Sequence, residues 1–214
     1  MSSEEIKIVI DTSVIRYFLL AGEERLLLDC VGGPIGIPRV VFDPDEETSL
    51  SENFRSEITR SIAYQDRKAK EAAEGSDLSA RSIQNSNRLR NIHTLYEDKH
   101  IVVLDLQENE QSLLSSLTSD SGCRAFGLKF PLGIGEAACL AIAHSRELDI
   151  ATDDNDAITA IQSLDMVGEV QRIRKLLISA ATGGLITENK ANEVHKMMRD
   201  LGFWDSVAPF VDVP

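Results

Sequence analysis

The chain has 214 residues, of which 43% are hydrophobic, and a formal net charge of −13 at pH 7. This length predicts a single domain with a helical extension and enough chain to bury a full core. The sequence has no basic-then-apolar leader and no apolar run near about 18 residues, so we expect neither a secreted nor a membrane-spanning protein. Three irregularly spaced cysteines suit a reducing, cytoplasmic location and make a zinc site improbable.

The first predicted strand, Ile6–Ile10, is a mostly apolar and β-branched run, which is typical of a strand covered on both faces. It ends at Asp11, and Val14–Leu20 is predicted to be helical. Thr12 or Ser13 can cap that helix. Asp11 is therefore expected at the end of a strand.

The middle of the chain alternates between helical and strand-like patterns. The expected elements are a helix at Glu24–Val31, a strand at Ile35–Phe42, an acidic loop at Asp43–Ser51, helices at Asn53–Glu74 and Leu78–Asp98, a strand at His100–Leu106, a helix at Glu108–Leu117 and a loop at Ser119–Leu132.

The segment from Gly133 to Asp156 has acids at the start of a predicted helix and directly after a predicted strand. Glu136 falls in the first turn of a predicted helix that is rich in small residues, which allows the helix to lie close to a sheet. A brief apolar strand, Leu148–Ala151, then leads into Thr152-Asp153-Asp154.

Helices at Ala157–Leu164, Glu169–Ala181 and Glu188–Leu201 complete the chain. The alternation of strands and helices predicts an α/β fold with a central parallel sheet and helices on both faces.

In such a sheet, acids at strand ends and helix starts can meet at one crevice. Asp11, Glu136 and one of Asp153, Asp154 or Asp156 are the candidates. The alternative is that they are unrelated helix caps and surface acids. Carboxylates that lie close together repel one another unless they are protonated or bridged by a cation. Oxygen-only ligands suit Mg²⁺ or Mn²⁺, which can activate water and neutralise charge on a phosphodiester.

At these residues the chain resembles the PIN-domain nucleases, in a subgroup related to VapC-type toxin ribonucleases. The resemblance rests on IVIDTS at the start, GEAACLAIA in the middle and IATDD after it, with Glu136 and Asp154 lying 18 positions apart. It covers about Ile6 to Leu164. It implies a three-layer PIN-like nuclease domain at residues 1–165, with a helical hairpin at 53–98, and a C-terminal helical extension of the same domain at 166–214.

The resemblance implies a Mg²⁺- or Mn²⁺-dependent endoribonuclease that leaves a 3′-hydroxyl and a 5′-phosphate. Asp11, Glu136 and Asp154 would be metal ligands, with Asp153 as a close neighbour or substitute. The remaining catalytic acid of the family could be Glu57 or an acid of Asp43–Glu47, and we favour Glu57 because a helix would fix it.

The RNA-binding surface is expected on the hairpin, because residues 55–90 hold 8 Lys/Arg and 5 Asp/Glu and form the only basic region. Arg81, Arg88 and Arg90 are the expected phosphate contacts. The alternative for these cations is pairing with acids of the hairpin itself. Thr152 is also assigned to substrate binding, and the resemblance adds an antitoxin protein and a second copy of the chain as expected partners.

Two other classes stay open. A receiver-type Mg²⁺-binding module would need a phosphorylatable acid, for which Asp105 is the candidate, and a late strand-ending lysine, which the sequence lacks. A PIN-like scaffold could also keep the fold and bind partners without cleaving RNA.

Overall fold

The computed structural model describes residues 5–46 and 55–210. In this part of the chain, short parallel strands form one sheet in the order β3-β2-β1-β4-β5. The strands are β1 (Ile8–Ile10), β2 (Ile35–Pro38), β3 (Ile101–Leu104), β4 (Asp149–Ala151) and β5 (Val170–Gln171). All three residues of the central strand β1 are buried, which explains its unbroken apolar sequence.

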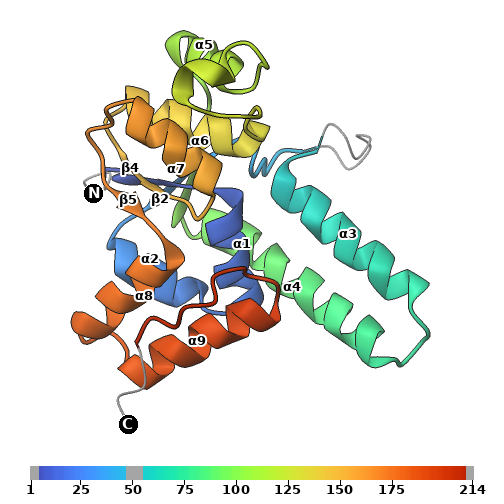
Figure 1. Cartoon of the computed structure of the whole chain (residues 1–214). Helices are drawn as coiled ribbons and strands as arrows, with labels where there is room; N and C mark the ends of the chain where they lie inside the picture. The colour runs from blue at the N-terminus through green and yellow to red at the C-terminus, as the bar shows by residue number, and fades with distance from the viewer. Residues whose placement is uncertain (1–4, 47–54, 211–214) are drawn as a thin grey trace.

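Helices cover both faces of the sheet, and Figure 1 shows the three layers. One face carries α1 (Thr12–Ala21), α2 (Glu24–Val31), α4 (Asp77–Glu97), α8 (Ile173–Thr182) and α9 (Glu188–Asp200). The other face carries α5 (Glu108–Leu117), α6 (Ile134–Ser145) and α7 (Asn155–Ser163). The predicted α/β fold class, a parallel sheet between two helical layers, is confirmed, and the arrangement is consistent with a three-layer PIN-like fold.

The predicted helical hairpin is formed by α3 (Glu57–Glu71) and α4, which pack along each other. Figure 1 shows the hairpin projecting away from the sheet, while the later part of α4 returns to pack against α1. Ser76 caps α4 by accepting from the Ser79 backbone at 3.2 Å. The predicted start of the first hairpin helix at Asn53 lies outside the described residues.

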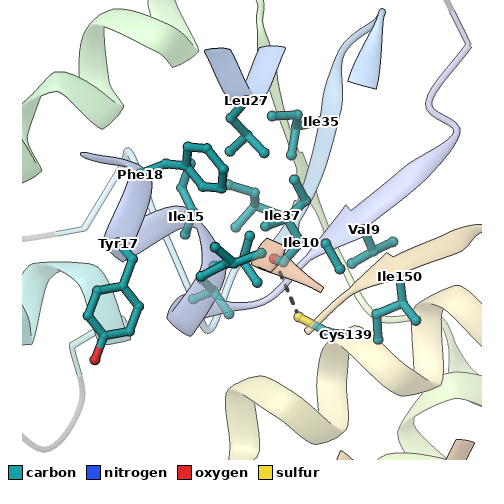
Figure 2. Close-up of a cluster of buried hydrophobic side chains, with 14 of the residues drawn as sticks. Val9, Ile10, Ile15, Tyr17, Phe18, Leu27, Ile35, Ile37, Cys139 and Ile150 are labelled. Carbon is teal, nitrogen blue, oxygen red and sulfur yellow. Dashed lines mark hydrogen bonds between the residues drawn. The ribbon is translucent and has the colours of Figure 1, made fainter. Parts of the chain in front are cut away.

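The core is built around β1, as Figure 2 shows. Val9, Ile10 and Ile37 from the sheet and Phe18 of α1 are all fully buried. Cys139 of α6 faces the sheet and donates its thiol proton to the Ile10 carbonyl at 3.6 Å. Small residues on α6 let that helix lie directly on β1, β2 and β4.

The C-terminal residues add an edge strand that the sequence did not predict. Val170 and Gln171 were expected in a helix beginning at Glu169, but they pair with β4 as β5, so that prediction was wrong. Backbone bonds from Ile150 to Glu169 (2.9 Å) and from Thr152 to Gln171 (3.0 Å) hold β5 in place. The helix α8 begins only after this pairing.

Beyond α9 the chain folds back on the domain. Phe203 is buried against the rings of Tyr17, at 5.2 Å between centroids, and His195, at 5.7 Å. Trp204 is half exposed, and the Arg172 guanidinium lies 5.4 Å from its ring centroid. The described helices include none that is both long and apolar enough to span a membrane.

A short 3-10 turn, η2 (Cys123–Phe126), lies within the segment predicted as a loop. It packs against α5 and α7.

Candidate active site

The candidate site lies at the carboxyl edge of the sheet between β1 and β4. The chain first builds β2 and β3 on one side of β1 and then returns to place β4 on the other side. Such a switch point is where open α/β sheets bind ligands. Asp11 directly follows β1 and its N–H donates to the carbonyl of Ala151, the last residue of β4, at 3.1 Å. The two strand ends are therefore joined at the candidate site.

Asp11 is 1% exposed, and three side-chain and backbone donors hold its carboxylate. Oδ1 accepts from Ser13 Oγ at 2.7 Å and from the Val14 N–H at 2.9 Å, so Asp11 caps α1. Oδ2 accepts from the hydroxyl of Thr152. Burial raises the pKa of Asp11 to about 6, although these hydrogen bonds oppose the rise. Thr152, expected to bind substrate, is 1% exposed and in this structure orients Asp11.

Glu136 lies in the first turn of α6 and accepts from the Gly133 N–H at 3.1 Å. This contact is one of the two hydrogen bonds of a capping box, the one from the N-cap backbone N–H to the side chain three residues later. Burial raises the pKa of Glu136 to about 7, and the negative charges of Asp154, Asp11 and Glu57 add to the rise. These four carboxylates thus interact electrostatically, although they come from four different segments.

Glu57 is the first residue of α3, and its carboxylate reaches the start of α1 and of α6. Oε2 accepts from the Thr12 hydroxyl. The carboxylate also lies over Gly135, where an added Cβ would be 2.6 Å from the Glu57 Cδ. Gly135 therefore leaves the space that Glu57 occupies. The Arg60 guanidinium lies 3.8 Å from Glu57 Oε1, at the outer side of the cluster.

The acids of the preceding loop are engaged elsewhere. Asp43 and Asp45 lie 2.7 and 3.7 Å from the Arg39 guanidinium. Glu46 accepts from the backbone and the hydroxyl of the serine that precedes α3, at 3.0 and 2.8 Å. Glu47 lies outside the described residues. Of the described candidates for the fourth acid, only the one at the start of α3 is in contact with the cluster.

The two aspartates after β4 have different surroundings. Asp154 caps α7 by accepting from the Ala157 N–H at 2.7 Å, and its charge acts on the cluster. Asp153 points toward α8, where it accepts from Arg172 Nε at 3.1 Å and from the Ile173 N–H at 2.9 Å. Burial raises the pKa of Asp153. Its contacts fasten the start of α8 to β4.

The donor set suits a hard divalent cation, because it consists of carboxylates whose mutual repulsion a cation would relieve. Burial is the main cause of the raised pKa values of Asp11 and Glu136, and repulsion from the neighbouring carboxylates adds to that of Glu136. In this structure, however, the four carboxylates accept hydrogen bonds from other groups of the protein. Within residues 5–46 and 55–210, no three His, Cys, Asp or Glu side chains already stand in an arrangement that could hold a metal ion.

Two of the three hairpin arginines expected to bind phosphate make contacts within the fold. Arg88 donates to the Leu20 carbonyl at the end of α1. Arg90 pairs with Asp66 of α3 at 2.7 Å. Arg81 is exposed on the early part of α4. The structure brings none of the three to the acid cluster.

One residue beside the acids was missed. Arg16 lines a groove of about 600 Å³ together with Thr12, Glu57 and Arg60, the last a cation of the basic hairpin. Tyr64, on the next turn of α3, lines it as well. Arg16 could have been found as a cation one helical turn beyond the acid that caps α1.

Asp105, on which the receiver-type alternative depends, follows the edge strand β3 and pairs with Arg39 at 2.6 Å. It is separated from Asp11 by the width of β2 and lies outside the cluster.

A scan of the chain against protein-family models and a search of curated proteins both find no match.

Proposed function

We propose that this protein is a PIN-type endoribonuclease that uses Mg²⁺ or Mn²⁺. The observation that carries the proposal is the meeting of Asp11, Glu57, Glu136 and Asp154 at the switch point of a parallel sheet. Four carboxylates held together in a partly buried place are unfavourable by themselves, so a fold that keeps them together suits a cationic ligand. The groove with Arg16 and Arg60 beside them suits an anionic polymer as substrate.

Each acid has a defined part in this proposal. Asp11, Glu136 and Asp154 would hold the ion, and Glu57 would join them by exchanging its contact with Thr12. A divalent ion bound there supplies charge neutralisation at a phosphodiester and promotes deprotonation of a water.

The chain's own residues prepare that chemistry. The Thr152 hydroxyl fixes the orientation of Asp11, a supporting contact of the kind that metal-binding carboxylates commonly have. Because burial raises the pKa of Glu136 to about 7, about half of the metal-free molecules would carry a proton there at neutral pH and would release it when a cation binds. Asp153 is a positioning residue, because its salt bridge to Arg172 ties α8 to the end of β4.

The test is cleavage of a labelled single-stranded RNA with Mn²⁺. Asp11→Asn and Glu136→Gln should each abolish cleavage while the circular dichroism spectrum stays unchanged. Asp156→Asn is the matched control, since this acid lies two residues after Asp154 in the first turn of α7 but is exposed. It should cleave like the wild type.

Full cleavage by Asp11→Asn, or by the wild type in excess EDTA, would refute the metal-dependent mechanism. A protein that binds RNA but never cleaves it, with any divalent ion, would be a PIN-like scaffold instead.

A toxin of a toxin–antitoxin pair is the biological setting that the family resemblance favours. A short neighbouring reading frame for a DNA-binding antitoxin would support it, and an isolated gene would favour RNA processing.

A further inference from the structure

The groove beside the acid cluster follows α1 and is bounded by α3 and α4. It has a volume of about 600 Å³, and its lining reaches from Thr12 and Glu57 to Leu20 and Leu201. Thr12 and Leu20 are eight residues apart on α1, which corresponds to roughly 12 Å of helix. The groove is therefore an elongated hollow that leads away from the acids.

Arg16, in the middle of α1, lines this groove and has an unsatisfied hydrogen-bond donor. Its Nε is buried and has no hydrogen-bond partner in the described part of the chain. One terminal nitrogen donates to the Tyr17 hydroxyl at 3.3 Å, and the guanidinium lies 5.0 Å from the Tyr17 ring. A buried donor without a partner is unfavourable, and a phosphate oxygen would satisfy it with a charge-assisted bond.

Arg60 provides a second cation at the end of the groove nearest the acids. Its side chain is 43% exposed, and its distance of 3.8 Å to Glu57 is longer than a hydrogen bond. Arg60 also lines a second hollow, of about 500 Å³, which contains Arg39 and Ile134. It therefore stands between two hollows, next to the place where a phosphodiester would be cleaved.

The groove also offers groups that suit bases. Tyr64 is 48% exposed, and the charged groups of Arg67 and Lys68 lie 5.9 and 5.8 Å from its ring centroid. Exposed aromatic rings beside cations are typical stacking platforms for single-stranded nucleic acids. The amides of Gln65 and Asn85, which also line the groove, can donate to and accept from base edges.

A helical peptide is a poorer match, because grooves that bind a helical peptide are mainly hydrophobic. Only three leucines are among the described residues that line this groove, Leu20, Leu89 and Leu201.

We propose that the groove binds the single-stranded RNA segment adjoining the cleaved phosphodiester, with Arg16 and Arg60 on its phosphates and Tyr64 stacked on a base. This inference rests on the proposed ribonuclease function. It moves the expected RNA contacts from Arg81, Arg88 and Arg90 of α4 to the groove beside α1.

The experiment measures binding separately from cleavage. A fluorescently labelled oligoribonucleotide of mixed sequence is titrated with the Asp11→Asn protein in EDTA, and anisotropy is read at several salt concentrations. Arg16→Gln, Arg60→Gln, Tyr64→Ala and Tyr64→Phe are each made in that background. Thermal melts verify that every variant is folded.

Arg16→Gln and Arg60→Gln should each weaken binding about tenfold and reduce the salt slope by about one. Tyr64→Ala should lose roughly 5- to 150-fold in affinity, and Tyr64→Phe should keep most of it, because stacking needs only the ring. Arg25→Gln is the matched control and should bind like the parent protein. Arg25 is exposed and lies beside His100, the residue before β3. It is therefore at the amino ends of the strands, whereas the acids lie at the carboxyl ends.

The outcomes distinguish this inference from the function on which it rests. If the wild type cleaves RNA but the groove variants bind like the parent, the RNA lies elsewhere and the inference is wrong. Loss of binding in the Arg81→Glu/Arg88→Glu/Arg90→Glu variant but not in the groove variants would assign RNA to these α4 cations and would also overturn the inference.

If the groove variants lose RNA binding but the wild type never cleaves, the groove assignment stands and the ribonuclease proposal falls. A parent protein without measurable RNA affinity, whose binding to a protein partner depends on Arg16 and Tyr64, would make the groove a protein-binding site and refute the inference.

Discussion

Replacing Asp11 by asparagine should stabilise the metal-free protein at neutral pH while it removes activity. Burial raises the pKa of Asp11 from 3.8 to about 6. This rise corresponds to roughly 3 kcal/mol of destabilisation once the group is ionised in both the folded and the unfolded state.

Asparagine retains part of the local structure. Its oxygen can still cap α1 through Val14, but its NH₂ group cannot accept from Thr152, which costs about 1 kcal/mol. We therefore expect a net gain of about 1–2 kcal/mol, which is a rise of roughly 2–8 °C in the unfolding temperature of a chain of this size.

The pH dependence follows from the same shift. Because the pKa of Asp11 is raised in the folded state, its favourable contribution is complete below 3.8 and is lost as the pH rises through about 6. The stability difference between variant and wild type should therefore grow from pH 4 to pH 7.5. Thermal melts in EDTA measure it, with Asp156→Asn as the exposed control.

Added Mn²⁺ should reverse the order of the two proteins. Ligand that binds only the folded wild type stabilises it by about 2.7 kcal/mol at 100 times its dissociation constant. An Asp11→Asn protein that is less stable than the wild type at pH 7.5 in EDTA would show that the carboxylate is not under electrostatic strain, and would refute this reasoning.

Three further outcomes are expected. Glu57→Gln should reduce Mn²⁺-induced thermal stabilisation more than Asp45→Asn does, and the opposite order would place the fourth ligand in the loop. Gly135→Ala should displace the Glu57 carboxylate, because the new Cβ would lie 2.6 Å from Glu57 Cδ; isothermal titration should then give weaker Mn²⁺ binding with little loss of stability. Glu110→Gln should destabilise the fold by about 3–5 kcal/mol in urea titrations, since it leaves Arg146 without the fully buried partner 2.7 Å away. Although burial alone would raise the pKa of Glu110, the Arg146 contact lowers it, so this stabilisation is present above about pH 4.5 and disappears as the pH falls through the lower folded-state pKa.

The parts of the fold that were predictable have a strong local pattern. The β-branched run that ends at Asp11 marked the central strand, and the small residues around Cys139 marked a helix packed directly on the sheet. Asp11, Glu136 and Asp154 could be proposed together because the ends of parallel strands share one edge. Local sequence was enough in each case, since burial on both sides leaves a clear periodicity.

The remaining features depend on contacts between distant segments. Val170 and Gln171 form β5 only because β4 offers an unpaired edge, and two residues carry no pattern of their own. Arg88 and Arg90 were expected to contact phosphate. In the structure Arg88 donates to the Leu20 carbonyl and Arg90 pairs with Asp66. Gly135 lies in the first turn of α6, but local sequence could not show that it also leaves room for a side chain from α3.

The pairing of β1 with β4 also sets the order in which the site can form during translation. Asp11 and the Thr152 hydroxyl that orients it are separated by 141 positions. At roughly 5–20 residues per second, the ribosome needs about 7–28 s to make the second after the first. A nascent chain therefore carries Asp11 and Glu57 for most of its synthesis without the strand that completes the cluster. Under the proposed function, the messenger RNA being translated is not exposed to an assembled nuclease on its own nascent chain until most of that chain has been made.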